Sequence, residues 1–243
     1  MTMVDNPRDH NLQILQNGTV QVAGQFMWGS NYTFLAKVET QGESLLAVYK
    51  PLRGERPLWD FPPGSLAARE VAAYLTSRAL GWDLVPPTVL REDGPAGPGS
   101  LQLYLDIDPE RHYFNFSDEE RQRLRPVVAF DVLINNADRK SGHILLGSDD
   151  HLWLIDHGIC FHRDHKLRTV VWDFVGQPIP QDILKDLRAF RNHLTSNDEL
   201  ASAFAELLSQ GEIEAMTVRA EQLITEGRFP EPDGVRPYPW PLV

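Results

Sequence analysis

The chain has 243 residues, a formal net charge of -11 at pH 7 and one cysteine. This length allows a substantial buried core and a single domain of two lobes. One cysteine excludes an internal disulfide, and the sequence has no evident secretory signal or long apolar stretch, so we expect a cytoplasmic protein with no integral membrane association. The acidic charge argues against binding to nucleic acid, because such binding requires a positive surface that displaces counterions.

The first part of the chain is predicted to form β-strands. Residues 19–26 and 33–39 have the composition of strands and enclose a short polar turn. The backbone amides of Gly29, Ser30 and Asn31 in this turn are candidates to bind the phosphate groups of a nucleotide.

Three further elements are expected before the middle of the chain. Residues 45–51 form an apolar strand with Lys50 near its end. Residues 65–75 have helical periodicity and carry Glu70. Residues 101–105 alternate in the manner of a half-buried strand.

The second half is predicted to be mainly helical. Ser117 and Glu120 have the spacing of a capping box, so we expect a helix from residue 117 to about residue 135. Amphipathic patterns predict packing helices at residues 182–194, 198–208 and 213–224. The proline-rich residues 229–243 are expected to form an extended strap or a loose tail.

A short hairpin is predicted between these helices. Apolar runs at residues 144–146 and 152–155 are separated by turn-forming residues. Asp138 and His143 enter this hairpin and Asp156 leaves it, so we expect the three side chains to converge.

These residue types suit phosphoryl transfer. In that reaction one carboxylate orients the attacking hydroxyl, and others hold the metal ion that bridges the phosphates. Lys140, close to Asp138 in the sequence, can supply positive charge to the transferred group.

The motif Asp138-Arg139-Lys140-x-x-His143, followed by Asp156-His157-Gly158, resembles the D-R-H-x-x-N and D-F-G motifs of the phosphatidylinositol 3-/4-kinase-like superfamily, and more closely its bacterial branch. The resemblance implies an α+β, two-lobed protein-kinase-like fold. It implies a β-rich nucleotide-binding lobe with a hinge at residues 1–107, and a helical lobe with the catalytic hairpin at residues 108–243. It also implies ATP and a divalent metal ion, manganese or magnesium, as cofactors.

The same resemblance implies roles for individual residues. Asp138 would be the aspartate of the catalytic loop, and Asp156 would bind the metal. Lys50 would contact the phosphates, with Glu70 as its partner. Residues 101–105 would lead to the hinge that faces adenine.

The motif departs from the superfamily pattern at three positions. Lys140 replaces a histidine, although protein kinases carry lysine at this offset. His157 replaces the phenylalanine of the second motif. His143 replaces an asparagine as a metal ligand, and imidazole suits manganese or other transition metals better than magnesium.

We therefore expect a kinase that transfers phosphate from ATP to a hydroxyl of an unknown protein or small molecule. One alternative is a nucleotide-binding pseudokinase that acts as a regulatory docking protein. Another is a metal-dependent hydrolase with the ligands His143, Asp156, His157, His162 and His165. The basic run at residues 162–168 is either a solvated loop or a contact for an acidic substrate. Cys160 is expected to be a buried packing residue.

Overall fold

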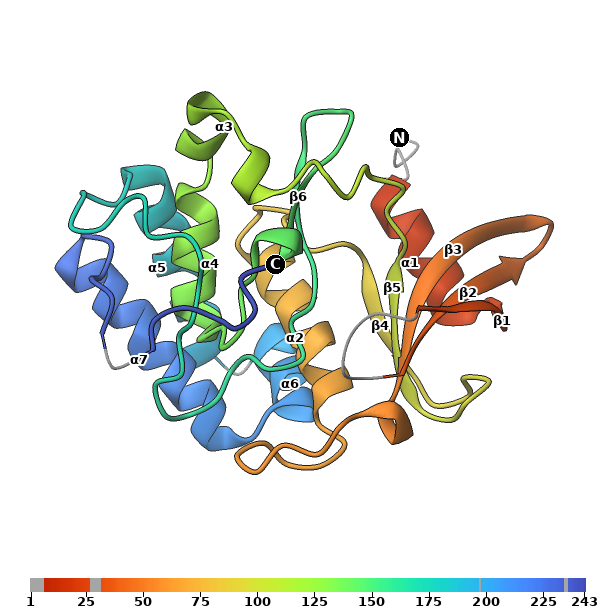
Figure 1. Ribbon diagram of the computed structural model, residues 1–243. Coiled ribbons are helices and arrows are strands. Elements are labelled where there is room, and N and C mark those ends of the chain that lie inside the picture. Colours follow the sequence, from red (N-terminus) through yellow and green to blue (C-terminus); the bar gives the residue numbers. More distant parts are fainter. Residues whose placement is uncertain (1–6, 27–31, 197, 234–235) are drawn as a thin grey trace, which may run out of the picture.

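The computed structural model describes residues 7–26, 32–196, 198–233 and 236–243. Within these ranges an antiparallel sheet of five strands forms the first part of the molecule, and helices dominate the rest (Figure 1). The strands follow the spatial order β1-β2-β3-β5-β4 and are β1 (Thr19–Phe26), β2 (Thr33–Thr40), β3 (Glu43–Pro51), β4 (Thr88–Arg91) and β5 (Gly99–Leu103). The expected α+β class and the strands expected around the polar turn are thus confirmed.

Local backbone chemistry explains how strand β3 is placed. Gln41 and Gly42 close the β2–β3 hairpin with positive φ angles of 46° and 88°, a conformation that matches the twist of paired strands. Gly99 of β5 lies beside Lys50 of β3, where a Cβ atom would be 2.4 Å from the Lys50 carbonyl oxygen. Glycine therefore permits the close approach of β5 at the point where β3 presents Lys50.

Helix α1 (Pro7–Asn17) covers one face of the sheet and was not among the elements expected from the sequence. Its Leu15 packs in a buried cluster that includes Leu101 of β5. Arg91 of β4 fastens the end of the helix by donating hydrogen bonds to the carbonyl oxygens of Leu15, at 2.8 Å, and Gly18, at 3.0 Å. The helix is therefore held by both apolar burial and a buried guanidinium.

Helix α2 (Leu66–Ala79) lies on the opposite face, against β4 and β5. Gln102 of β5 lines the same cavity as Glu70 of α2, whereas its neighbour Leu101 packs with α1. Successive side chains of a strand point to opposite faces, which puts the two helices on opposite sides of the sheet. Figure 1 shows this arrangement, with α1 and α2 flanking the strands.

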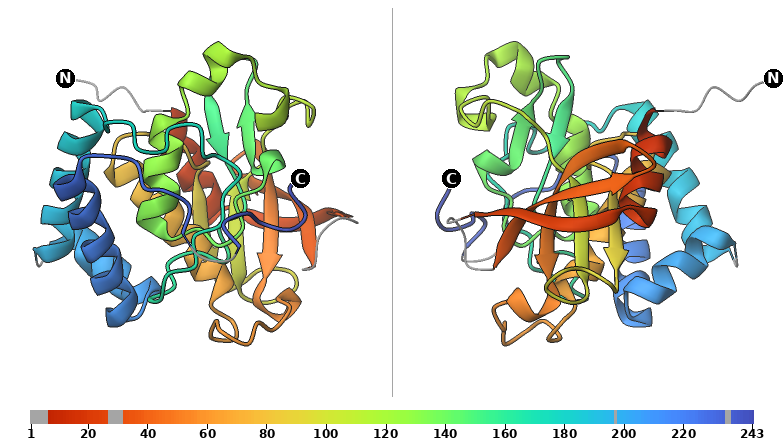
Figure 2. Two further views of the ribbon diagram at one scale, coloured as in Figure 1. Left: turned by 60° about the vertical axis from the view of Figure 1, so that its left-hand side comes forward. Right: turned by 90° about the vertical axis from the view of Figure 1, so that its right-hand side faces the viewer.

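The rest of the chain is mainly helical, with a small hairpin at its centre. Its helices are α3 (Asp118–Gln122), α4 (Arg125–Ile134), α5 (Gln181–Thr195), α6 (Glu199–Leu207) and α7 (Gln210–Glu226). Its two strands are β6 (Ile144–Leu146) and β7 (Leu152–Leu154), and short 3₁₀ helices lie at η1 (Leu52–Gly54), η2 (Tyr113–Asn115) and η3 (Ser141–His143). The hairpin lies between α4 and the five-stranded sheet (Figures 1 and 2).

One expected helix is divided in two. The sequence predicted a continuous helix from residue 117 to about residue 135, but α3 ends at Gln122 and α4 begins at Arg125. Pro126 in the first turn of α4 has no N–H group to donate to the preceding turn, so a continuous helix would lose a hydrogen bond there. The capping box of Ser117 and Glu120 at the start of α3 is present as expected.

The proline-rich end of the chain forms a strap rather than a loose tail. The amide of Thr169 donates to the carbonyl oxygen of Pro237, at 3.1 Å, and the amide of Ser141 donates to that of Leu242, at 2.9 Å. The described residues 236–243 therefore lie against the segment that precedes β6 and against the segment that follows β7.

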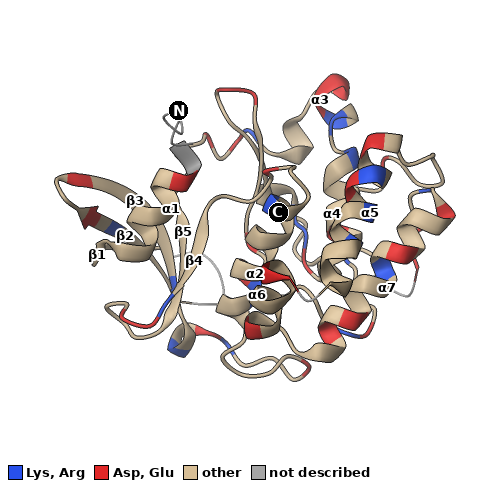
Figure 3. Cartoon of the chain, turned by 180° about the vertical axis from the view of Figure 1, so that it is seen from behind, with Lys and Arg blue, Asp and Glu red and all other residues tan. Residues whose placement is uncertain are grey.

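Helices α5 and α7 carry charges of both signs. Figure 3 shows acidic and basic residues interspersed on α5 and α7. None of the described helices is long and apolar enough to cross a membrane.

Candidate active site

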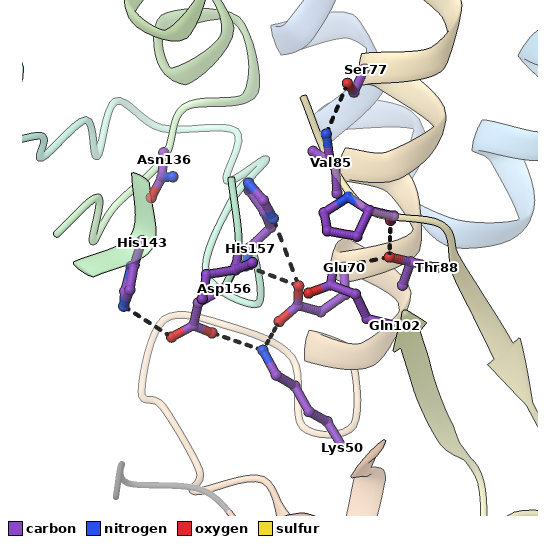
Figure 4. A network of polar contacts seen from close by, with 12 residues as sticks. Lys50, Glu70, Ser77, Val85, Thr88, Gln102, Asn136, His143, Asp156 and His157 are labelled. Carbon is purple, nitrogen blue, oxygen red and sulfur yellow. Dashed lines mark hydrogen bonds and ion pairs between the residues drawn. The ribbon is translucent and has the colours of Figure 1, made fainter. Parts of the chain in front are cut away.

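Lys50, Glu70 and Asp156 meet between the sheet and the hairpin (Figure 4). The ammonium group of Lys50 donates a hydrogen bond to Glu70 of α2 and lies 3.0 Å from Oδ1 of Asp156. The ion pair expected between Lys50 and Glu70 is therefore present. Asp156 follows β7 and is 106 positions from Lys50 in the sequence, so only the fold brings these two side chains together.

The charges in this group stabilise one another. Burial works against the charged form of Lys50, but Asp156 and Glu70 outweigh it and raise the pKa of the ammonium group. Lys50 in turn is the main cause of the lowered pKa of Asp156, with a smaller contribution from His143. Lys50 is therefore positive and Asp156 negative at neutral pH.

Glu70 uses both carboxylate oxygens. Oε1 accepts from Lys50, and Oε2 accepts from the backbone N–H of His157 at 3.0 Å. The Glu70 side chain is only 3% exposed, so both bonds are sheltered from water. Glu70 thus joins strand β3, helix α2 and the segment after β7 at one point.

His143 faces Asp156 from the other side. Its Nε2 atom lies 3.5 Å from Oδ2 of Asp156. Burial is the main reason why the pKa of His143 falls to about 4, with further lowering by Arg139 and Lys140. The imidazole is consequently neutral at physiological pH, the form that binds metal ions.

This pair of side chains fits a metal ion that is shared with another ligand. Carboxylate and imidazole groups offer two donors on one side, and Asp156 is 53% exposed and so accessible to a ligand. Among the described residues, no group of three or more His, Cys, Asp or Glu side chains could hold a metal ion. Asp156 and His143 therefore offer two ligands to a divalent ion.

Asp138 lies on the loop between α4 and the hairpin. Its backbone N–H donates to Oδ1 of Asn136, at 2.9 Å. Its carboxylate oxygen Oδ2 lies 3.3 Å from the ammonium group of Lys140. Burial raises the pKa of Asp138 to about 6, although Lys140 acts in the opposite direction. The site therefore combines a carboxylate of raised pKa with a cation directly beside it.

A buried guanidinium that was not among the expected site residues supports this loop. Arg139 is fully buried and pairs with Asp131 of α4 at 2.9 Å. It also donates to the carbonyl oxygen of Ile155, at 3.0 Å, and approaches Nε2 of His157 at 2.9 Å. Arg139 thus ties the loop of Asp138 to the segment of Asp156. An acid at position 131, alone among the apolar residues of α4, was the one local signal of such a network.

A cavity of about 330 Å³ opens beside the charged group. Lys50, Glu70, His143 and Asp156 lie on its wall, and the rest of its lining is largely apolar. This part of the lining comes from the sheet, from residues 103–105 and from the hairpin. It includes Val48, Gln102, Leu103, Tyr104, Leu145 and Ile155. Gln102 is held by a bond of 2.9 Å from its amide nitrogen to Oγ1 of Thr88. A mostly apolar cavity with a few charged side chains at one wall is typical of a small-molecule binding site.

The five residues considered for a hydrolase do not gather. Nε2 of His162 lies 3.0 Å from the carbonyl oxygen of Asp60, and Nε2 of His165 pairs with Asp233 at 2.7 Å. His157 is fully buried against Arg139. The ligand set expected for a hydrolase is therefore wrong, because His162, His165 and His157 face different partners.

The remaining expectations have different outcomes. Cys160 is buried, as expected of a packing residue. Gly29, Ser30 and Asn31, proposed to bind phosphate, lie outside the described residues. The roles assigned to Asp138, Lys140, Lys50, Glu70, His143 and Asp156 stay predictions.

Solved structures of kinases share this fold. The Golgi casein kinase with Mn/ADP bound aligns with a TM-score of 0.52 and 17% identity, over 90% of this chain and 74% of that chain. The Helicobacter pylori proinflammatory kinase CtkA aligns with a TM-score of 0.55 and 12% identity, over 88% of this chain and 94% of that chain. These likenesses show a protein-kinase-like fold.

Sequence comparison adds two kinds of relative. Phosphatidylinositol 4-kinase gamma 4 of Oryza sativa subsp. japonica is 30% identical over 180 residues, which cover 59% of this chain but 32% of that protein. Protein Rv2133c of Mycobacterium tuberculosis is 42% identical over an alignment of 269 positions, which covers 96% of this chain and 96% of that protein. No protein-family model matches the chain. On the strength of a similarity that spans nearly the full length of both proteins, this kinase-like chain belongs to the same family as protein Rv2133c.

Proposed function

We propose that the protein is an ATP-dependent phosphotransferase that acts on a hydroxyl group of a protein or small molecule. The observation that carries this proposal is the contact of Lys50 with both Glu70 and Asp156 at the wall of the cavity. We further propose membership of the phosphatidylinositol 3-/4-kinase-like superfamily. The motifs around Asp138 and Asp156 and the similarity to the plant enzyme support this assignment.

ATP would bind between a nucleotide-binding part, residues 1–107, and a catalytic part, residues 108–243. Its adenine would lie in the apolar region of the cavity near Val48 and Leu145, and its phosphates would contact Lys50. Lys50 is suited to this because Glu70 holds its ammonium group at the cavity wall. The electrostatic attraction of a fixed cation for phosphate oxygens is strong where water is excluded.

A divalent ion, Mn²⁺ or Mg²⁺, would be held by Asp156 and His143 and by the phosphates. Its contribution when bound is to neutralise charge on the phosphates. Asp156 is ionised and His143 is neutral at physiological pH, so both side chains are ready to bind. The Golgi casein kinase that shares the fold was crystallised with Mn/ADP, which supports this expectation.

Asp138 would act on the acceptor hydroxyl, and Lys140 would act on the transferred phosphoryl group. The hydroxyl oxygen attacks the terminal phosphorus, the bond from that phosphorus to the bridging oxygen breaks, and ADP leaves with the electron pair. Asp138 would accept the hydroxyl proton, and Lys140, 3.3 Å from it, would stabilise negative charge on the transferred group. The raised pKa of Asp138 brings its basicity closer to that required at neutral pH.

The test is turnover of labelled ATP by the purified chain with manganese or magnesium. We expect autophosphorylation, slow ATP hydrolysis or labelling of a component of a cell lysate. Asp138→Asn should reduce the rate at least 100-fold, whereas the matched change Asp118→Asn, on the exposed start of α3, should leave it unaltered. ATP binding without turnover would indicate the pseudokinase. A protein that neither binds ATP nor turns it over would refute both the kinase and the pseudokinase.

A further inference from the structure

The residue next to Glu70 anchors helix α2 to the helical part of the molecule. Arg69 is only 1% exposed, which is unusual for an arginine. Its Nη2 atom donates to Glu212 of α7, and its Nη1 atom donates to the carbonyl oxygen of Cys160 at 2.6 Å. Its guanidinium also lies 4.8 Å from the centre of the Phe61 ring. Three separate segments therefore converge on one side chain.

Glu212 is itself fixed in place. It belongs to the capping box at the start of α7, where its Oε2 atom accepts from the N–H of Ser209 at 2.9 Å and from its hydroxyl at 2.8 Å. Its Oε1 atom remains for Arg69. Because α7 packs against α4 and α5, Arg69 is joined to the core rather than to a loop.

Arg69 and Glu70 have complementary tasks on α2. Glu70 reaches Lys50 and the N–H of His157, while Arg69 reaches α7 and the Cys160 carbonyl. Both residues thus hold α2 against the segment that follows Asp156. A displacement of α2 would leave the guanidinium buried without its partners, and an unpaired buried charge is strongly unfavourable.

The segment after Asp156 is also held in place, by hydrogen bonds from the end of α4. The amide nitrogen of Asn135 donates to the carbonyl oxygens of His162 and Asp164, both at 2.8 Å. From residue 157 to residue 171 the sequence contains one hydroxyl side chain, Thr169, and it is 1% exposed. This segment therefore offers no accessible hydroxyl for phosphorylation, and its contacts are made by unmodified side chains.

We propose that Arg69 is a positioning residue that anchors α2 to α7 and to the Cys160 segment, so that Glu70 holds Lys50 in place before nucleotide binds. The catalytic role of the Lys50–Glu70 pair rests on the function proposed above, but the anchoring of α2 does not. The protein is assembled in its active arrangement without movement of α2 and without modification of the segment after Asp156.

Hydrogen exchange of the unaltered protein gives the first test. The amides of residues 66–79 should exchange slowly in the absence of nucleotide, at rates close to those of α7. Saturating ATP with manganese should slow them by less than threefold. Slowing of more than tenfold would mean that nucleotide assembles α2, and the proposal would be wrong.

Variants give the second test. Arg69→Met should speed exchange in α2 at least tenfold and lower kcat for ATP turnover at least tenfold, with KM for ATP changing less than threefold. Arg78→Met is the matched control, because Arg78 lies on the same helix in an exposed pair with Asp9. It should alter each quantity less than twofold.

A double variant separates positioning from stability. Arg69→Met with Glu212→Gln removes both buried charges, keeps a side-chain oxygen for the capping box of α7, and should recover most of the thermal stability lost in Arg69→Met. It should keep the fast exchange of α2 and the lowered kcat. Recovery of normal exchange and kcat together with stability would show that Arg69 serves stability alone. If the unaltered protein proves to have no turnover, the proposed function fails, and the exchange measurements still decide the anchoring of α2.

Discussion

At the scale of single residues, the site contains two titratable groups that differ in a functionally useful way. Burial raises the pKa of Asp138 to about 6 and lowers that of His143 to about 4. His143 is therefore neutral over the whole range in which Asp138 changes charge. A loss of activity between pH 7 and pH 5 would report the protonation of Asp138 rather than that of His143.

We predict that kcat/KM for ATP falls about tenfold per pH unit below pH 6, because protonated Asp138 cannot accept the hydroxyl proton. Lys140 favours the ionised carboxylate, so Lys140→Met should raise the pKa of Asp138 and move this decline to higher pH, in addition to lowering the maximum rate. The measurement is the pH profile of both proteins in the same buffers. A decline at the same or lower pH in Lys140→Met would contradict the assignment to Asp138.

At the scale of elements, the end of α4 organises the segments around the site. Asn135 has a φ angle of 52°, in the left-handed region, and terminates the helix. Its side chain donates to the carbonyl oxygens of His162 and Asp164 and accepts from the N–H of Lys166 at 2.9 Å. One residue thus ends the helix and holds the loop that follows Asp156.

Substitutions of Asn135 should separate these two effects. Asn135→Gly keeps the backbone conformation but removes three hydrogen bonds, which should cost roughly 2–4 kcal/mol of unfolding free energy. Asn135→Ala should cost about 1 kcal/mol more, because a Cβ atom disfavours the left-handed conformation. Asn17→Gly, at the exposed end of α1, should cost less than about 1 kcal/mol. Denaturant unfolding measures all three, and equal losses would exclude a special role for Asn135.

At the scale of the whole molecule, the cavity lies where the sheet, α2 and the hairpin meet. Its walls come from β3, β5, α2 and the residues on both sides of the hairpin. A ligand in this cavity contacts both parts of the chain and binds only the folded protein. Ligand binding should therefore stabilise the molecule as a unit.

We predict that ATP with manganese, at about 100 times its Kd, stabilises the protein by about 2.7 kcal/mol. For a chain of this size the melting temperature should rise by roughly 5–10 °C. Manganese alone should have a much smaller effect, because the described residues supply only Asp156 and His143 for it. Lys50→Met should abolish most of the ATP-dependent shift. A shift with manganese alone equal to that with both would indicate a metal site independent of nucleotide.

Much of the fold could be predicted because its signals are local. The strand that ends near Lys50, the helix that carries Glu70 and the hairpin between His143 and Asp156 follow from periodicity and turn chemistry within a few residues. Helix α1 was missed because its residues Pro7–Asn17 are mostly polar and its burial depends on the sheet. The break between α3 and α4 was missed although Pro126 marks it.

The networks around the site could not be predicted in the same way. Arg69 and Glu212 are 143 positions apart, and Lys50 and Asp156 are 106 positions apart. The sequence does not distinguish a charged residue at the surface from one in the interior. Only the packing of distant segments decides which charged side chains are buried. The ion pair of Arg139 with Asp131 is closer in sequence, but its burial also depends on the segment of His157.

The sequence by itself determined the types of residue available for chemistry and most of the elements in their order, because local propensities depend on neighbouring positions, and its motifs carried the resemblance that implied the α+β class. The tertiary structure decided which of the charged side chains meet. It placed Lys50 between two carboxylates, separated His162 and His165 from the site, and joined α2 to α7 through Arg69. Buried charges require partners at hydrogen-bond distance, and those partners come from whichever segments the folded chain packs together.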